Sequence, residues 1–338
     1  MNYFRLLAAA GIVGSVAGAV PAVAGAQAFL PAKGDVYVSV LFSNMYSNRH
    51  YLPVQEVDLG EIDSNALLFD ATYGLSDRMA ISFGLPLVVS RYQGTRPHQA
   101  ANPYRLDDGH WHPTFQDVRV NVRYNAVRRG AFAVTPFVGT AMPSHGYAYW
   151  AHAAPGTNLK QMNMGVSAAS LLDKVRPGLF VQGRYAFSVA EHVAYVTPTR
   201  SSLDLELGYF ISPELRLFSL VTAQKSHSGI DTSLTLVQDV PEVQFQNHDR
   251  ISRDDFLHVG GGASFTLTER LDLFGAFVTQ VAGRNGHKVN RNISLGVTWN
   301  LRRANRSAGS GGAPPTPTQA ADDAAPAKSL VRCLCQKG

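Results

Sequence analysis

The sequence predicts an all-β protein, an antiparallel up-and-down transmembrane β-barrel of about twelve strands with short periplasmic turns and long extracellular loops. Three observations predict it. The chain opens with a segment typical of an export signal. No later apolar run approaches the roughly 18 residues that a spanning helix needs. Strands of alternating polarity are joined by connections that alternate in length. Together these observations predict a protein of the bacterial outer membrane.

The first 26 residues have the composition of a signal peptide. Arg5 supplies a positive charge, residues 6–23 are apolar and rich in Ala and Gly, and Ala24-Gly25-Ala26 fits a cleavage site of small residues. A single membrane anchor is the alternative, but Pro21 and the weak hydrophobicity of Ala and Gly disfavour it. We therefore expect residues 1–26 to be cleaved on export.

The composition fits a membrane-embedded sheet better than a nucleic-acid-binding protein. Of the 338 residues, 45% are hydrophobic and only 16% are charged. The net charge of +5 comes from the signal, which carries +1, and from the segment after Leu301, which carries +4, so the middle of the chain is about neutral. This distribution indicates no nucleic-acid partner, and a secreted soluble β-protein is the competing class.

Polar and apolar residues alternate over about twelve segments, which we interpret as strands. The clearest are 117–124, 203–209 and 292–301, in which aliphatic or aromatic residues occupy every second position. The others are Asp35–Ser47, Ser64–Leu75, Arg78–Tyr92, Phe132–Pro143, Lys160–Leu172, Leu179–Glu191, Leu215–His227, Phe256–Leu267 and Leu271–Gly283. One face of each clear strand suits lipid and the other suits a polar interior.

The connections between these strands alternate between tight polar turns and long segments. The turns are Ser76–Arg78, Arg128–Gly130, Asp173–Gly178, Ser212–Glu214 and Thr268–Arg270. The long segments include Arg49–Asp63, Gln93–Thr114, Ser144–Leu159 and Ser228–Asp255. Outer-membrane barrels place short turns in the periplasm and long loops outside the cell, whereas a soluble sandwich has no reason to alternate so strictly.

Three of the turns follow an aromatic residue by a few positions. These residues are Tyr73, Tyr209 and Phe265. Aromatic rings are favoured at the headgroup boundary of a barrel, so the pattern predicts an inner aromatic girdle. Hairpins of any β-protein can converge on similar turns, which is the alternative interpretation.

Beyond Leu301 the chain turns to Gly, Ser, Ala, Pro and Thr, a composition that cannot bury a core. We expect residues 27–301 to form the barrel and residues 302–338 to form a flexible periplasmic tail. The two cysteines, Cys333 and Cys335, both lie in this tail, and two thiols alone make an incomplete metal site. We expect them to have no part in the main function, with pairing between molecules as the exception.

The hairpin residues resemble a known family. Tyr73-Gly74-Leu75-Ser76-Asp77-Arg78 runs into a strand that contains Leu85-Pro86, and Asp117 opens another alternating strand. This pattern is similar to the outer-membrane transporter family labelled MetA-pathway of phenol degradation, although Phe115-Gln116 stand where that family usually has a glycine. The resemblance covers roughly Asp35–Leu301. It implies a barrel that moves small, hydrophobic or aromatic compounds, and it identifies no substrate-binding residue.

Alternation directs a set of polar side chains into the barrel. They are Asp117, Arg119, Asn121, Arg123, Gln182, Arg184, Asp204, Glu206, His258 and Asp272. We assign them as pore-lining residues, because opposed charges across a narrow lumen select solutes by charge and size. We also expect Arg184 to pair with the strand that carries Asp204 and Glu206. A packed polar interior is the alternative. Barrels with few strands are filled by their own side chains and barrels with many strands leave a channel, and a strand number of twelve falls between the two.

Histidines gather in the predicted outer loops. His50, His98, His110, His112, His145, His152, His192, His227, His248 and His287 lie in or beside them, and His258 lies near the outer end of its strand. Imidazoles at a channel mouth could sense pH or bind a metal, and Asp107–His112 is the densest cluster. Polar residues collect in loops in any case, so we predict no metal site and no cofactor.

The same loops carry aromatic residues, which are Tyr51, Tyr92, Tyr104, Trp111, Tyr147, Tyr149, Trp150 and Tyr195. We interpret them as an outer aromatic girdle. A stacking surface for an apolar solute is the alternative.

Catalysis finds little support in the sequence. Ser226-His227-Ser228 is the one Ser–His candidate near the membrane boundary. A nucleophile and its base must come within hydrogen-bond reach, but adjacent residues of a strand point to opposite faces. We therefore predict no catalytic residues.

The sequence favours a monomeric outer-membrane channel that passes small solutes, including hydrophobic or aromatic compounds, through a narrow polar lumen. Its partners would be those solutes and the lipid of the outer membrane. Two other classes stay open. One is a closed barrel that displays its loops for adhesion or assembly without transport, and the other is an outer-membrane lipid hydrolase.

Overall fold

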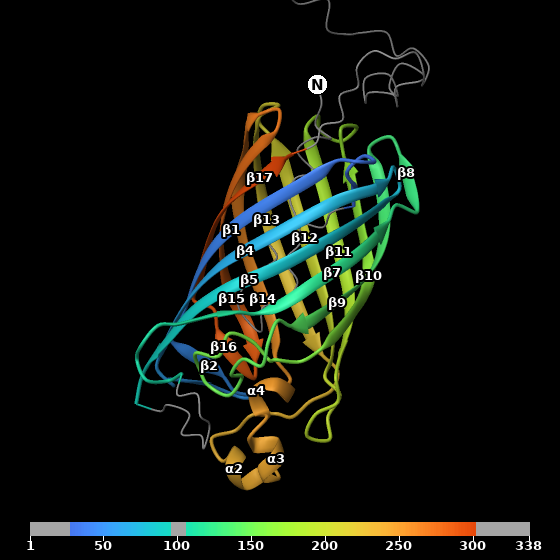
Figure 1. Cartoon of the computed structure of the whole chain (residues 1–338). Coiled ribbons are helices and arrows are strands. Elements are labelled where there is room, and N and C mark those ends of the chain that lie inside the picture. The colour runs from blue at the N-terminus through green and yellow to red at the C-terminus, as the bar shows by residue number, and fades with distance from the viewer. Residues whose placement is uncertain (1–27, 96–105, 302–338) are drawn as a thin grey trace, which may run out of the picture.

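Twelve long antiparallel strands close into one barrel (Figure 1). The computed structural model describes residues 28–95 and 106–301. The first wall strand, β1 (Val36–Ser47), pairs on one side with β4 and on the other with the last strand, β17 (Arg291–Asn300). Closure satisfies backbone hydrogen bonds between strands and leaves no open sheet edge, which a lipid environment requires.

The other wall strands follow one another around the barrel in chain order. They are β4 (Glu61–Ser76), β5 (Met79–Gln93), β7 (Asp117–Tyr124), β9 (Phe132–Pro143), β10 (Gln161–Leu171), β11 (Leu179–Ala190), β12 (Thr199–Phe210), β13 (Leu215–Ser226), β14 (Asp255–Thr268) and β15 (Leu271–Arg284). All the predicted strands are confirmed. The largest difference is at β12, which begins at Thr199 rather than Leu203, because the polar residues before Leu203 hide the start of the alternation.

The predicted alternation of short and long connections is also confirmed. Tight turns join β4 to β5, β12 to β13 and β14 to β15 at one end of the barrel, which is the upper end in Figure 1. The long loops and the helices lie at the opposite end. The short turns are therefore periplasmic and the long loops extracellular.

The outer loops contain regular structure that the sequence analysis did not predict. A separate three-stranded sheet consists of β2 (Arg49–Tyr51), β3 (Glu56–Val57) and β16 (Gly286–Lys288). One loop carries the short helices α2 (Leu236–Asp239), α3 (Glu242–Phe245) and α4 (His248–Ile251). In the same region β6 (His112–Phe115) pairs with β5 of the wall, whereas β8 (Val127–Arg129) pairs with β9 at the periplasmic end of the barrel. These elements are too short for a period to be recognised in the sequence.

No helix among the described residues is long and apolar enough to cross a bilayer.

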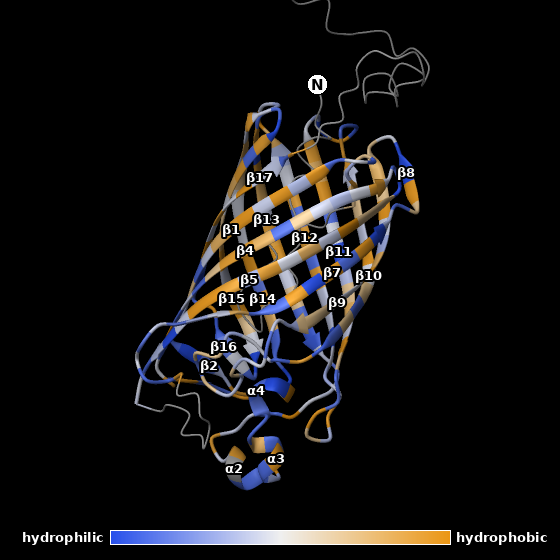
Figure 2. Ribbon diagram, viewed as in Figure 1, coloured by the Kyte–Doolittle hydropathy of each residue, from blue (hydrophilic) through white to orange (hydrophobic). Residues whose placement is uncertain are grey.

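Apolar side chains cover the outside of the barrel. On β12, Leu203, Leu205 and Leu207 face outward and are 39%, 43% and 50% exposed. In Figure 2 hydrophobic residues alternate with more polar ones along the strands, and hydrophilic residues are frequent in the outer loops. Tyr73 and Phe265, two residues of the predicted inner girdle, are exposed on this outer surface beside periplasmic turns. The barrel thus presents to its surroundings the surface that a bilayer solvates.

Candidate functional site in the barrel lumen

The ten predicted pore-lining residues all lie on lumen-facing positions of their strands. Seven are buried, namely Asp117, Arg119, Arg123, Gln182, Asp204, Glu206 and His258. Asn121, Arg184 and Asp272 are partly exposed. Their pore-lining role stays a prediction. The structure brings most of them into two groups, which are separated along the wall by β9 and β10.

The first group lies on β4, β5 and β7 and is centred on two arginines. Arg123 donates hydrogen bonds to the hydroxyl of Ser82 at 2.9 Å and to that of Thr72 at 3.4 Å. Asp70 interacts electrostatically with both Arg119 and Arg123. Gly84 stands between Asp70 and Arg119 in the register, and a Cβ there would come within 2.5 Å of the Asp70 carboxylate. The glycine therefore leaves room for the carboxylate to reach across β5.

The second group lies on β11, β12 and β13. Arg184 forms the predicted ion pair with Asp204, with 3.4 Å between Nη1 and Oδ2. Gln182 donates a hydrogen bond of 2.6 Å to Glu206 Oε2, and Arg216 lies 3.4 Å from Glu206 Oε1. Opposite charges in a lumen shielded from bulk water interact more strongly than they do on a surface, so this group holds the three strands in a defined arrangement.

We name these two groups together the polar belt, with Asp70, Arg119, Arg123, Gln182, Arg184, Asp204, Glu206 and Arg216 as its members. His258 on β14 lies near the belt, where its ring stacks on Phe256 with centroids 4.3 Å apart and interacts with Gln280 of β15.

The chain segment before β1 lies inside the periplasmic end of the barrel. The carbonyl oxygen of Ala28 accepts hydrogen bonds from Asn125 Nδ2 at 3.0 Å and from Thr135 Oγ1 at 2.6 Å. Farther along, the segment passes against β4 at Gly74, where a Cβ would overlap the carbonyl group of Ala32. The N-terminal plug, residues 28–32, is therefore fixed by specific contacts to the wall.

Aromatic rings hold the plug in place. Phe29 is 4% exposed and packs in one cluster with Phe180, Phe210 and Phe218, which all face the lumen. Burying a phenylalanine contributes about 1.5–3 kcal/mol, so this contact favours the closed position of the segment. The plug could not be recognised in the sequence, because Ala28-Phe29-Leu30 carries no pattern that distinguishes it from a linker.

A second segment enters the lumen from the outside. The loop between β9 and β10, residues 144–160, folds inward, so that Tyr147, Ala151 and Ala153 are buried. The Tyr147 hydroxyl donates a hydrogen bond to Asp117, and Gln116 donates one of 2.7 Å to the carbonyl of Pro155. Burial, together with the neighbouring Asp117 carboxylate, raises the pKa of Tyr147, which keeps its hydroxyl protonated as the donor. We call this segment the inward loop.

Between the inward loop and the outer loops lies a chamber of about 500 Å³. Aromatic side chains of Tyr149, Trp150 and Phe245 line it. Arg200 and Asp254 also line the chamber and attract each other. Arg200 is four residues before Asp204 on the same face of β12, so the chamber lies above the polar belt on the extracellular side.

Four of the predicted loop histidines line this chamber, namely His50, His152, His248 and His287. Nδ1 of His50 and Nδ1 of His287 are 3.4 Å apart, and the ring of His152 lies edge-on to that of His287. His152 also stacks on Tyr92 with centroids 4.6 Å apart. Three loops that are distant in the sequence therefore meet through imidazole rings.

The structure separates the other histidines from this site. His112 and His110 face Asp108 at 2.8 and 3.4 Å in an exposed loop, where the hydrogen bond from His112 lowers the pKa of Asp108. His98 and Tyr104 lie outside the described residues, as do the predicted signal peptide and tail. No group of three or more His, Cys, Asp or Glu residues in the described part of the chain has the arrangement of a metal site.

The predicted outer girdle is wrong for several of its members. Tyr92 and Tyr147 are 1% and 5% exposed and face inward, and Tyr149 and Trp150 line the chamber. The girdle interpretation assumed that loop aromatics stay at the outer surface, whereas the inward loop carries three of these four into the barrel mouth. Trp111 does remain outside, 41% exposed, with Arg91 stacked 4.6 Å above its ring.

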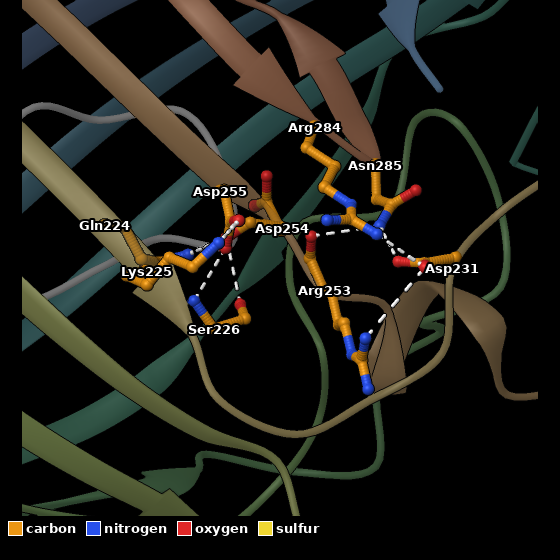
Figure 3. A network of polar contacts seen from close by, with 9 residues as sticks. All are labelled: Gln224, Lys225, Ser226, Asp231, Arg253, Asp254, Asp255, Arg284 and Asn285. Carbon is orange, nitrogen blue, oxygen red and sulfur yellow. Dashed lines mark hydrogen bonds and ion pairs between the residues drawn. The ribbon is translucent and has the colours of Figure 1, made fainter. Parts of the chain in front are cut away.

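Polar contacts anchor the loop that bears the helices (Figure 3). Asp231 pairs with Arg284 at 2.6 Å and accepts a hydrogen bond from Asn285, which ties the start of the loop to the end of β15. At the end of the loop, the carbonyl of Asp254 accepts a hydrogen bond of 2.7 Å from Gln224 on β13. The loop that covers the chamber is thus fastened to the barrel rim at both ends.

Sequence reasoning missed three charged residues of the lumen. Asp70 and Arg216 belong to the polar belt, and Arg200 lines the chamber. Alternation contained the signal for two of them, because Phe69 and Ala71 flank Asp70, and Leu215 and Leu217 flank Arg216. Arg200 had no such signal, because its neighbours are polar.

Comparison with known proteins supports the fold. The chain superposes on the crystal structure of an outer-membrane channel from Pseudomonas putida F1 with a TM-score of 0.60, over 86% of this chain and 99% of that one, at 14% sequence identity. The chain therefore has the fold of an outer-membrane β-barrel. The NanC porin matches with a TM-score of 0.46 at 12% identity, over 78% of this chain and all (100%) of the porin. The translocator domain of the autotransporter NalP from Neisseria meningitidis gives 0.46 at 12% identity, over 80% of this chain and 90% of the domain.

No protein-family model matches the sequence, and no curated protein matches it.

Proposed function

We propose that this outer-membrane barrel is a channel for small solutes that carry an aromatic or other apolar group. The observation that supports it most strongly is the chamber of about 500 Å³ above a belt of ionisable side chains inside a closed barrel. A chamber of this volume falls in the range of small-molecule sites, and its aromatic lining offers stacking surface. The polar belt offers hydrogen bonds and charge to a solute that leaves the chamber.

Two segments occupy parts of the lumen. The plug lies in the periplasmic end and the inward loop in the outer end, and most of the polar belt is buried. Passage of a solute therefore requires that the plug or the inward loop move aside. Both segments lie outside the wall strands, so their contacts can rearrange without disturbing the hydrogen-bond ladder of the wall.

Solute efflux from liposomes tests this function. Folded protein in liposomes should release phenyl glucoside faster than methyl glucoside, because only the former has a ring that can stack in the chamber. Trp150→Ala should reduce the preference severalfold, whereas Trp111→Ala, on the outside of the barrel, should leave it unchanged. Equal release from liposomes with and without the folded protein would contradict the channel and favour a closed barrel that displays its loops.

A further inference from the structure

A serine and a histidine meet on the outer surface of the barrel, outside the lumen described above. Ser201 Oγ lies 2.7 Å from His227 Nε2, and the Tyr185 hydroxyl lies 2.9 Å from the same Oγ. These three side chains come from β11, β12 and the end of β13, and all three point away from the lumen. The triplet Ser226-His227-Ser228 behaves as predicted, because Ser226 faces inward and bonds the carbonyl of Asp254 while His227 is exposed. The partner of His227 is a serine from the neighbouring strand.

The pair lies where the apolar surface of the barrel ends. One step toward the periplasm, Leu203 pairs across the strands with Ala223, and both face lipid. At the next outward-facing level, about 7 Å farther out, Ser201 pairs with Lys225, which is ion-paired with Asp255. Apolar residues thus give way to charged ones at the level of Ser201. In a bilayer this boundary is where the acyl chains of lipids join the headgroups through ester bonds.

The geometry at Ser201 meets the first requirement of an activated nucleophile. A hydrogen bond of 2.6–3.2 Å between the hydroxyl and the basic nitrogen is the usual distance, and it allows the imidazole to take the proton as the hydroxyl attacks. The backbone N–H of His227 donates to the Thr199 carbonyl at 2.9 Å, and its ring packs beside Phe187 with centroids 6.0 Å apart. These contacts hold the imidazole over Ser201.

Two side chains that can donate hydrogen bonds neighbour Ser201 on the outer surface. Lys225 stands directly across from Ser201 in the strand register. An ammonium group has three donors, and the ion pair with Asp255 leaves others available. The Tyr185 hydroxyl is the second donor within reach of the reaction centre. Electrostatic stabilisation of an oxyanion of this kind is a large contribution to acyl-transfer catalysis.

We propose that Ser201 and His227 form a catalytic pair that hydrolyses carboxylic esters of acyl lipids in the outer leaflet. Ser201 Oγ attacks the ester carbonyl as its proton passes to His227 Nε2, and Lys225 and Tyr185 stabilise the oxyanion. The ester C–O bond then breaks, and the alcohol leaves with the proton from His227. Water hydrolyses the acyl-serine by the same route, which releases the fatty acid and restores Ser201. This activity is independent of the channel, because none of these residues faces the lumen.

Covalent labelling is the first test. The full-length protein, refolded in lipid–detergent micelles, is treated with an alkyl fluorophosphonate, which forms a Ser–O–P bond and releases fluoride. We expect the label on Ser201 by mass spectrometry and its loss in Ser201→Ala. His227→Gln should slow labelling by at least about a hundredfold, because general-base assistance contributes 10²–10⁴-fold. Ser228→Ala is the matched control, because Ser228 lies at the same rim but bonds to the Thr197 carbonyl rather than to His227.

Lipid hydrolysis is the second test. Fatty-acid release is measured from phosphatidylethanolamine vesicles and from lipopolysaccharide aggregates, and release from either one identifies the source of the ester. Ser201→Ala should abolish release while solute efflux through the barrel is unchanged, so the two functions can fail separately. A heat-modifiable gel shift confirms that each variant is folded. A folded wild-type protein that takes no label on Ser201, or release that persists in folded Ser201→Ala, would overturn the proposal.

Discussion

Deleting residues 28–32 should raise the single-channel conductance of the barrel severalfold. The plug lies in the periplasmic end of the lumen, where Phe29 packs against rings of the wall and Ala28 accepts two hydrogen bonds. Its removal leaves a space lined by Phe180, Phe210 and Phe218 on one side and by Asn125 and Thr135 on the other. Water enters a cavity that offers polar partners, so the vacated end should hydrate and conduct.

Planar bilayer recordings at neutral pH measure this effect directly. Removing five residues from the segment after Leu301 gives a matched control, which we expect to conduct like the full-length chain. A milder variant, Phe29→Ala, should flicker between two levels because it weakens the apolar contact without removing the segment. Truncated and full-length proteins that both conduct, and to the same extent, would mean that the barrier lies elsewhere, at the inward loop.

Asp254→Asn should change the pH dependence of stability by about 3 kcal/mol. Burial, opposed by the nearby Arg200, raises the pKa of Asp254 to about 6 from an ordinary value of 3.8. A carboxyl whose pKa is higher in the folded state binds its proton more tightly there than in the unfolded chain. Its stabilising contribution is therefore complete below pH 4 and is lost as the pH rises through 6. The difference of about two pKa units corresponds to about 3 kcal/mol at 1.36 kcal/mol per unit.

Urea unfolding in detergent between pH 4 and pH 8, followed by tryptophan fluorescence, tests this expectation. The free energy of unfolding of the wild type should fall relative to that of Asp254→Asn over this interval, and the two should run parallel above pH 7. The asparagine keeps the shape of the side chain without the charge, so it isolates the ionisation. Parallel curves from pH 4 to pH 8 would mean that water solvates the Asp254 carboxyl as well in the folded protein as in the unfolded chain.

The wall of the barrel could be predicted from the sequence because the pattern that identifies each strand lies within the strand itself. Period-two alternation, as in 117–124, and tight turns such as Ser212–Glu214 identify a strand and its ends without knowledge of any neighbour. The same alternation placed ten polar residues on the inner face and anticipated the contact of Arg184 with Asp204. Outer-membrane barrels show this clearly, because lipid on one face and a polar lumen on the other separate the two sets of side chains.

The contents of the lumen could not be predicted in this way. Phe29 is buried because four rings meet in three dimensions, and the inward loop is held by contacts from separate parts of the chain, such as that of Tyr147 with Asp117. The contact of Ser201 with His227 depends on the register between β12 and β13. Alternation does not determine this register, because a shift of two residues keeps the same side chains on the same face. Each of these features is a contact between residues that are distant in the sequence, and the local sequence around one residue does not indicate its partner.

The most direct test of the account is the reversal potential of the truncated barrel, lacking residues 28–32, in a KCl gradient. If the polar belt lines the conducting path, neutralising Arg119 and Arg184 with glutamine should shift the reversal potential toward cation selectivity, because two positive charges leave the lumen. Arg91→Gln, on the outside of the wall, should leave it unchanged. A folded truncated barrel that passes no current, or a current whose selectivity ignores the lumen arginines, would contradict the assignment of this protein as a channel.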